Sequence, residues 1–296
     1  MAIHLLQVPY DSGHRARRMG RGPVHLVEHG TALDCLRGTD PDVRLVPVET
    51  TSAFTTEIGS AFELHRGVSE AVAAAVRDGA LPLVLSGNCN IAIGTVSGLQ
   101  ITDPDAPVGV VWFDGHGDCN TPETFTGGFL DAMGLSTLTG RCWQALCATV
   151  PGFRPLPDEH VALVGAHGAD RGALGVLAAS GMAHVRTADV ITQGGVTALG
   201  PVLDALAGRG VERVYVHLDV DVLDAAWAPA NEFAPEGGLL PHQLAACVGE
   251  VIQRFTVAAA AVASYDPMCD REDRVLCAAL GFLELIASSG RLAVPA

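Results

Sequence analysis

Two apolar segments of the chain each end in a group of acidic residues, and this pattern restricts the folds open to it. The first segment, Val108–Phe113, is followed by Asp114, His116 and Asp118. An unbroken run of β-branched and aromatic residues is typical of a buried strand. In an extended chain alternate side chains lie on one side about 6.6 Å apart, so this spacing predicts three ligands facing one point. The alternative interpretation is a polar loop that merely follows a strand.

The second apolar segment ends at Leu218 and is followed by Asp219 and Asp221. Burying two unpaired carboxylates is unfavourable unless a positive group meets them. The nearest basic residue, Arg213, lies at the other end of the strand. Oxygen and imidazole ligands suit Mn²⁺ or a similar divalent ion. Four carboxylates carry more charge than one such ion balances, which indicates two bridged cations.

These motifs resemble those of the arginase–agmatinase (ureohydrolase) family. Asp-x-His-x-Asp-x-Asn begins at Asp114, and Asp-x-Asp-x-x-Asp begins at Asp219. A third family motif, Gly-Gly-Asp-His-Ser, corresponds to Ser86–Asn90, where Cys89 occupies the position of a ligand histidine. The resemblance in order and strand context extends from Val8 to about Pro267. It implies an arginase-like fold and a hydrolytic metal centre.

The resemblance also implies a ligand set for two divalent cations, expected to be Mn²⁺. One cation would be held by Cys89, Asp114, Asp118 and Asp219, and the other by Asp114, His116, Asp219 and Asp221. Asp118 would in addition orient the attacking hydroxide. Cys89 has a second interpretation, an ordinary buried thiol. As a thiolate ligand it would favour a softer metal such as zinc, iron or cobalt.

Four further positions concern the substrate. By the resemblance, Asp131 occupies the place of a histidine that transfers protons; it could equally meet a cationic group or cap a helix. Ser264 occupies the place of a glutamate that pairs with the substrate guanidinium, and its presence removes a charge-assisted bidentate contact. Asn120 and Asp170 match positions that hold the amino-acid end of the substrate.

Cysteine at the first ligand position, with Asp-Gly-His-Gly-Asp and Asn-Thr-Pro-Glu-Thr, resembles a narrower branch of the family, that of the N-hydroxyarginine hydrolase of cycloserine biosynthesis. The implied function is a binuclear-metal hydrolase that cleaves a C–N bond of a guanidino, N-hydroxyguanidino or other amidine-like small molecule by metal-bound hydroxide. The alternative is an arginase-fold pseudoenzyme or interaction module without ureohydrolase activity.

Strands and helices alternate along the rest of the chain, which predicts parallel βαβ units. We expect one three-layer α/β domain over residues 1–296, with a mainly parallel sheet of about eight strands flanked by helices. The expected strands are Ile3–Val8, Val43–Val48, Leu81–Leu85, Val108–Phe113, Val161–Gly165, Ala183–Arg186, Val211–Leu218 and Val257–Ser264. The expected helices are Pro23–Gly30, Glu57–Asp78, Ile91–Leu99, Arg171–Ala179, Val196–Ala207, Pro241–Arg254 and Arg274–Ser288, with a loop over Pro9–Arg21.

Composition restricts the partners and the compartment. A net charge of −15 argues against nucleic acid or an anionic membrane as partner. The eight cysteines contain no C-x-x-C pair, which fits reduced thiols in the cytoplasm. The segment Met1–Val8 lacks the basic region of a signal peptide, and no apolar run has the length of a membrane span. We expect a cytoplasmic protein with a small-molecule substrate and, by the resemblance, a homo-oligomer (trimer or hexamer).

Overall fold

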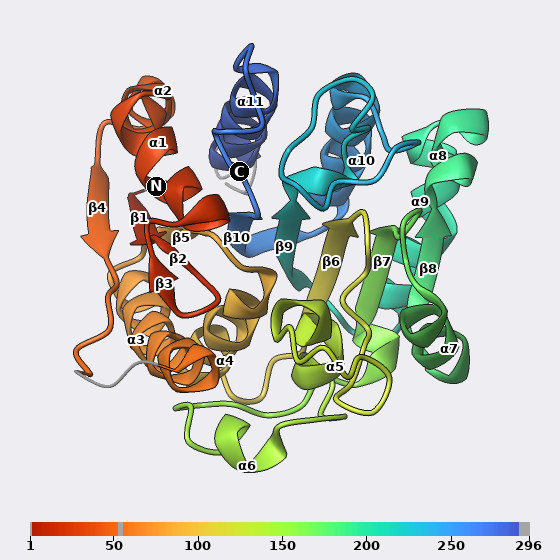
Figure 1. Cartoon of the computed structure of the whole chain (residues 1–296), viewed down its shortest axis with the longest axis horizontal. Helices are drawn as coiled ribbons and strands as arrows, with labels where there is room; N and C mark the ends of the chain where they lie inside the picture. The colour runs from red at the N-terminus through yellow and green to blue at the C-terminus, as the bar shows by residue number, and fades with distance from the viewer. Residues whose placement is uncertain (1, 53–55, 290–296) are drawn as a thin grey trace.

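An eight-stranded sheet, with every neighbouring pair parallel, runs through the computed structural model, which describes residues 2–52 and 56–289 (Figure 1). Its order is β4-β1-β5-β10-β9-β6-β7-β8. The strands are β1 (Ile3–Val8), β4 (Val43–Pro47), β5 (Leu81–Ser86), β6 (Val108–Asp114), β7 (Val161–Gly165), β8 (Ala183–Arg186), β9 (Arg213–Asp219) and β10 (Thr256–Ala263). The predicted domain over 1–296 includes residues 1, 53–55 and 290–296, which lie outside the described residues.

The central strands are apolar because both faces of the sheet are covered. Every residue of β5 and β6 is buried. A strand of a parallel sheet with helices on both faces has no solvent side, so its sequence reads as a continuous apolar run. The expected α/β class with about eight mainly parallel strands is therefore confirmed.

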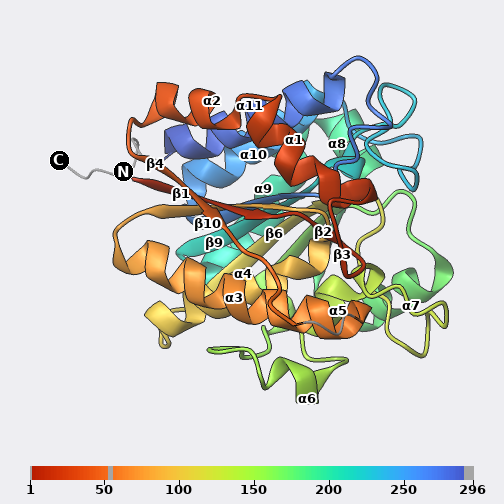
Figure 2. The same ribbon diagram turned by 60° about the vertical axis from the view of Figure 1, so that its left-hand side comes forward.

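Helices form a layer on each face of the sheet, as Figures 1 and 2 show. One layer contains α1 (Gly22–Glu28), α2 (Ala32–Thr39), α8 (Thr187–Gln193), α9 (Gly195–Gly208), α10 (Pro241–Arg254) and α11 (Arg274–Ser289). The other contains α3 (Glu57–Arg77), α4 (Ala92–Thr102), α5 (Gly134–Leu138) and α7 (Arg171–Ala179), with the short α6 (Gln144–Cys147) beyond it. Among the helices within the described ranges, none is both long and apolar enough to cross a membrane.

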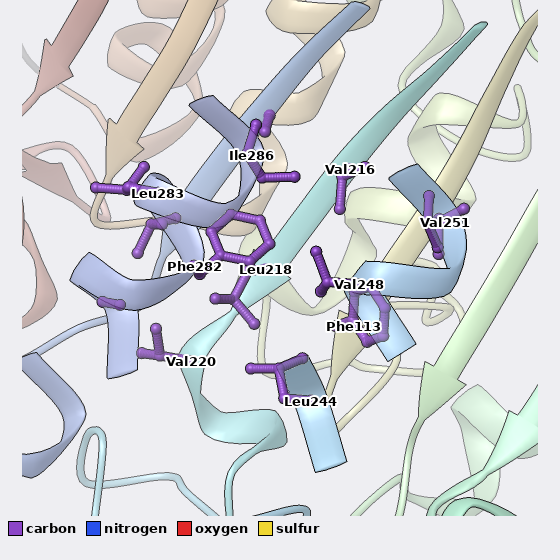
Figure 3. Packing of buried hydrophobic residues seen from close by; sticks show 14 of the residues in the cluster. Phe113, Val216, Leu218, Val220, Leu244, Val248, Val251, Phe282, Leu283 and Ile286 are labelled. Carbon is purple, nitrogen blue, oxygen red and sulfur yellow. The ribbon is translucent and has the colours of Figure 1, made fainter. Parts of the chain in front are cut away.

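Branched and aromatic side chains interlock between the sheet and the layer that contains α10 and α11 (Figure 3). Phe113 and Leu218 project from the sheet toward Val248 of α10 and Phe282 of α11. All four are almost completely buried. Truncating such side chains typically destabilises a protein by about 2–5 kcal/mol, so this packing fixes the helices on the strands that end at the site.

In the other layer, α3 and α4 approach each other closely because α4 carries glycines at the contact. A Cβ on Gly94 would lie 2.5 Å from the carbonyl oxygen of His65, and one on Gly98 would lie 2.6 Å from that of Ser69. Both distances are shorter than any van der Waals contact with a carbon atom. The two glycines therefore set the distance between these helices.

The segment Pro9–Arg21, predicted to be a loop, contains regular structure. Strands β2 (Tyr10–Asp11) and β3 (His14–Arg15) form an antiparallel pair, and a 3₁₀ turn, Arg18–Arg21, follows. Helix α2 was not predicted; Thr31, in the left-handed region at φ +56°, separates it from α1. These elements are short and have no clear hydrophobic period, so the sequence pattern does not distinguish them from loops.

Candidate metal centre

Four neighbouring strands end at one edge of the sheet, and a polar or sulfur-containing side chain lies at or just after the end of each. Cys89 follows β5, Ser264 follows β10, Asp219 ends β9 and Asp114 ends β6. These strands are adjacent in the sheet order, and Ala263 of β10 is in register with Asp219 of β9. We call the resulting group the strand-tip cluster. Its members are Cys89, Asp114, His116, Asp118, Asp131, Asp219 and Asp221.

One half of the strand-tip cluster is formed by Asp114, His116 and Asp221, whose ligand atoms lie within 4.8 Å of one another. The Nδ1 atom of His116 is 3.2 Å from Asp221 Oδ2. Burial opposes the charged imidazole, but the hydrogen bond with Asp221 outweighs it and raises the pKa of His116 to about 9. Despite its own burial, Asp221 has a lowered pKa because His116 bonds to it. These three side chains supply two carboxylates and an imidazole as candidate metal ligands.

The other half of the strand-tip cluster contains Cys89, Asp118 and Asp131, again with ligand atoms within 4.8 Å of one another. The three predicted ligands Asp114, His116 and Asp118 do not all belong to one triad, although Asp114 is the charge that acts most strongly on Asp118. The chain does not stay extended after β6: it bends at Gly115 and His116, and Gly117 (φ +92°) and Asp118 (φ +47°) both adopt a positive φ. This bend places Asp118 with Cys89 and Asp131.

Asp219 connects the two halves. Its Oδ2 atom accepts a hydrogen bond from the Cys89 thiol at 2.9 Å, and its Oδ1 atom accepts one from the Asp221 backbone N–H at 2.8 Å. Burial and the neighbouring Asp221 raise the pKa of Asp219 well above its ordinary value. Burial likewise raises the pKa of the Cys89 thiol. Asp219 belongs to neither triad, but its two oxygen atoms contact a residue of each, as a carboxylate between two cations would.

The charge balance of the strand-tip cluster fits divalent cations. Asp118 Oδ2 is buried and has no hydrogen-bond partner within the described residues. Burial, followed by the nearby Asp114, raises the pKa of Asp118 far above its ordinary value. The sequence contains no lysine, and in the described ranges no arginine pairs with Asp114, Asp118 or Asp219. Oxygen, nitrogen and one sulfur donor with an orphaned carboxylate oxygen form a donor set suited to divalent metals.

Asp131 is held by two N–H donors. Its Oδ2 atom accepts from Asn88 Nδ2 at 2.8 Å, and its Oδ1 atom accepts from the Asn90 backbone at 2.9 Å. The side chain does not cap the 3₁₀ turn that it begins, so the helix-cap interpretation is wrong. Burial outweighs both hydrogen bonds and raises the pKa of Asp131 to about 7.

The predicted substrate residues lie in two places. Asn120 Nδ2 donates to Asp170 Oδ2 at 2.9 Å, and Asp170 also caps α7 by accepting from the Ala173 backbone N–H. Ser264 is instead buried inside the strand-tip cluster, at φ +65°, with its Oγ atom 3.2 Å from Cys89 Sγ. The structure therefore brings Ser264, but not the Asn120–Asp170 pair, against a predicted ligand.

Three residues that the sequence did not indicate support the strand-tip cluster. The Trp112 indole N–H donates to Asp114 Oδ2 at 2.8 Å. Asn88 binds Asp131, and Asn231 donates to the carbonyl oxygen of Ser264 at 2.8 Å. Trp112 precedes Asp114 by two positions in a strand, a spacing that could have revealed it. Asn231 lies in an irregular segment after β9, where no pattern marks it.

The comparisons with known proteins agree with this geometry. A family model described as the arginase family matches residues 1–287. An arginase from Bacillus caldovelox is 26% identical over 291 residues, which cover 95% of this chain and 96% of the relative. The crystal structure of an arginase from Bacillus subtilis superposes with a TM-score of 0.86 at 24% identity, covering 97% of this chain and 98% of that one. A formimidoylglutamase from Bacillus subtilis has a TM-score of 0.74 at 18% identity, covering 100% and 89%.

Proposed function

Because the chain belongs to the arginase family, we propose that it is a binuclear-metal hydrolase that cleaves a C–N bond of a guanidino, N-hydroxyguanidino or other amidine-like small molecule. The observation that carries this proposal is the division of the strand-tip cluster into two groups of metal-ligating atoms connected by Asp219. Two-metal sites of this kind serve hydrolysis at planar carbon and phosphorus centres.

We propose two divalent cations as cofactors, with Mn²⁺ as the expected metal. The residues that would hold them are Cys89, Asp114, His116, Asp118, Asp219 and Asp221. When bound, such a pair lowers the pKa of a shared water from about 15.7 toward about 7 and so supplies the nucleophile at neutral pH. His116 would bind as neutral imidazole, so metal affinity should fall as the pH is lowered.

The chain's own residues orient the reaction. Asp118 has an oxygen that no described residue engages, and that oxygen can accept a hydrogen bond from the attacking water and fix its direction. The Trp112 indole holds Asp114 in one rotamer. Ligands held by such outer hydrogen bonds keep their geometry, and removing one typically reduces metal affinity or activity about 10–100-fold.

Ser264 restricts the substrates that the proposed site could bind. A serine at this position cannot form the bidentate ion pair that a carboxylate would offer to a guanidinium. The Asn120–Asp170 pair at the start of α7 offers an amide and a carboxylate to the polar end of a substrate. The branch resemblance through Cys89 supports an N-hydroxyguanidino acid, and the fold shared with a formimidoylglutamase supports other linear amidines.

A pseudoenzyme without ureohydrolase activity is the less favoured candidate. A fold that had lost its chemistry would have no reason to keep an unpartnered buried carboxylate such as Asp118, since such groups are destabilising. We further propose that the protein is cytoplasmic, folds as one domain and forms a homo-oligomer, a trimer or a hexamer. Light scattering on the eluted protein tests the oligomeric state.

Elemental analysis combined with a substrate panel tests the proposed function. The protein as purified, and again after chelation and reloading with Mn²⁺, is assayed for bound metal. The panel contains guanidino, N-hydroxyguanidino and formimino acids, and the assay detects urea, hydroxyurea or formamide. Two equivalents of metal with release of one of these products supports the proposal. A protein that binds no metal and turns over nothing on the panel contradicts it.

A further inference from the structure

By the family resemblance, proton transfer is one of the roles open to Asp131, but the structure places this carboxylate among the candidate ligands. One of its oxygen atoms lies within 4.8 Å of a ligand atom of Cys89 and of Asp118. Within the described residues, the only other triad of this kind contains Asp114, His116 and Asp221. A group whose task is to exchange protons with solvent needs access to water, yet Asp131 is only 6% exposed.

The hydrogen bonds of Asp131 leave it free to coordinate a metal. Each carboxylate oxygen has two lone pairs, and each oxygen of Asp131 accepts one N–H donor. One lone pair on each atom is therefore left. The two donors, Asn88 and the Asn90 backbone, fix the plane of the carboxylate. Ligating carboxylates are ordinarily oriented by hydrogen bonds of this type.

A second observation points to a cation at this place. The neighbouring Asp118 has a buried oxygen without any partner in the described part of the chain. Its exposed fraction is 8%. Cys89, the third member, is 1% exposed and donates its proton to Asp219. A buried carboxylate oxygen that nothing engages is unfavourable unless a positive group meets it, and three negative or ionisable ligands surround that point.

We propose that Asp131 is a direct ligand of the cation bound by Cys89 and Asp118, so that a further carboxylate ligand, and not a proton-transferring group, stands at this position. This inference rests on the proposed two-cation site. Asn88 is then a positioning residue, which acts through Asp131. Its carboxamide oxygen accepts from the Ser12 backbone N–H at 2.8 Å, and this contact fixes the direction of its N–H donors.

The test compares Asp131→Asn with Asp170→Asn, since both carboxylates accept the same types of hydrogen bond, although Asp131 is buried and Asp170 is exposed. Each carboxylate accepts one asparagine side-chain N–H and one backbone N–H at 2.8–2.9 Å. Each substitution removes one negative charge, but Asp170 belongs to neither ligand triad. The metal-free proteins are titrated with Mn²⁺ by calorimetry, and bound metal is counted by elemental analysis.

We expect wild type and Asp170→Asn to bind two equivalents with similar affinities. We expect Asp131→Asn to lose one equivalent, or to bind it at least about 100-fold more weakly, because a ligand is lost. A Co²⁺ titration identifies the half that is affected. The sulfur-to-cobalt charge-transfer band, which reports Cys89, should weaken in Asp131→Asn, whereas absorption from cobalt in the other half should persist.

The outcomes separate this inference from the proposed function. Suppose that wild type and Asp131→Asn both bind two equivalents of metal with equal affinity, and that their sulfur-to-cobalt charge-transfer bands are equally strong. Asp131 is then not a ligand, and the two-cation proposal stands. If wild type itself binds no metal, both proposals fail. If Asp131→Asn does not fold, the same Mn²⁺ and Co²⁺ titrations of Asn88→Ala test whether Asp131 is a ligand. A loss of about 10–100-fold in affinity at the Cys89 half supports the inference, and unchanged affinity overturns it.

Discussion

Asp219 is the residue on which the two halves of the proposed centre depend. It accepts the Cys89 thiol on one oxygen and the Asp221 backbone N–H on the other, and it is 5% exposed. A carboxamide in its place keeps the size of the side chain but loses the charge and one of the two acceptor atoms. The substitution should therefore weaken metal binding more than it lowers the stability of the fold.

We predict that Asp219→Asn lowers bound Mn²⁺ below two equivalents and reduces turnover of the substrate found in the panel by at least about 100-fold. Elemental analysis and steady-state kinetics check this. Asp224→Asn is the control, because Asp224 accepts from the backbone N–H groups of Ala226 and Gly237 through one oxygen that a carboxamide retains. Full metal content in Asp219→Asn would show that this residue does not bridge.

At the scale of the element, the close contact between α3 and α4 gives two predictions. The helices meet where Gly94 lies against the backbone of His65, and the His65 ring is fully buried with no hydrogen-bond partner for either nitrogen in the described ranges. Its nearest aromatic neighbour is Phe62, whose ring is 5.0 Å away and nearly perpendicular. The interface between α3 and α4 therefore has a steric constraint, at Gly94, and an electrostatic one, at the buried His65 ring.

The first prediction concerns the steric constraint. Gly94→Ala should lower the free energy of unfolding by about 1–3 kcal/mol, because its methyl group would meet a backbone oxygen that cannot move independently of α3. Gly281→Ala is the matched control within α11, since no atom lies within 4 Å of its added Cβ. That change should raise the free energy by about 0.5–1 kcal/mol through helix propensity. Urea denaturation measures both, and equal effects would refute the close contact.

The second prediction concerns His65. Burial, with a smaller effect of Arg66, lowers the pKa of His65 to about 3 in the folded protein, against about 6.5 in the unfolded chain. The unfolded chain thus binds the extra proton between these values, so the stability present above about pH 6.5 is lost as the pH falls toward 3. His65→Leu lacks the titrating imidazole. As the pH falls, its free energy of unfolding should therefore decrease less than that of wild type, by at most about 1.4 kcal/mol per pH unit.

Urea denaturation of wild type and His65→Leu at pH 7 and pH 5 measures that difference. His242→Leu, which changes an exposed histidine at the start of α10, should follow the wild-type profile. If His65→Leu loses as much stability as wild type over the same interval, the buried imidazole is not the source of the pH dependence.

The elements that the sequence predicted are those with a strong hydrophobic pattern. Strands such as Val108–Asp114 are continuously buried and therefore continuously apolar, so both their positions and the acids at their ends could be read directly. The pattern could not show the bend at Asp118, because its left-handed conformation depends on the surrounding chain. Asn88 was missed for a similar reason, since its partner Asp131 lies 43 positions away in the sequence.

At the scale of the whole molecule, the proposed cations should contribute to stability as well as to chemistry. The strand-tip cluster concentrates buried carboxylates whose pKa values are raised, as those of Asp114, Asp118 and Asp219 are. Without a counter-charge these groups disfavour the ionised folded state. Any ion that binds only the folded protein stabilises it by mass action.

We predict that Mn²⁺ at 100 times its dissociation constant raises the free energy of unfolding by about 2.7 kcal/mol for each site filled. Thermal unfolding of the chelated and reloaded protein at pH 7 measures the shift. Mg²⁺ at the same concentration is the comparison, because it prefers oxygen ligands and octahedral geometry and should stabilise less. Identical unfolding temperatures with and without Mn²⁺ would contradict the proposed centre.

As a proposed metal ligand among carboxylates, Cys89 also determines which contaminating ions would inhibit the protein. Thiolates bind soft ions such as cadmium and mercury far more readily than carboxylates do. Trace amounts of these ions should therefore poison this protein under conditions that leave a centre of oxygen and nitrogen ligands intact. Exposed Cys277 offers mercury a second point of attachment on the molecule's surface. Assay buffers freed of heavy metals, and reductants that do not themselves chelate, are thus a condition for measuring the proposed activity.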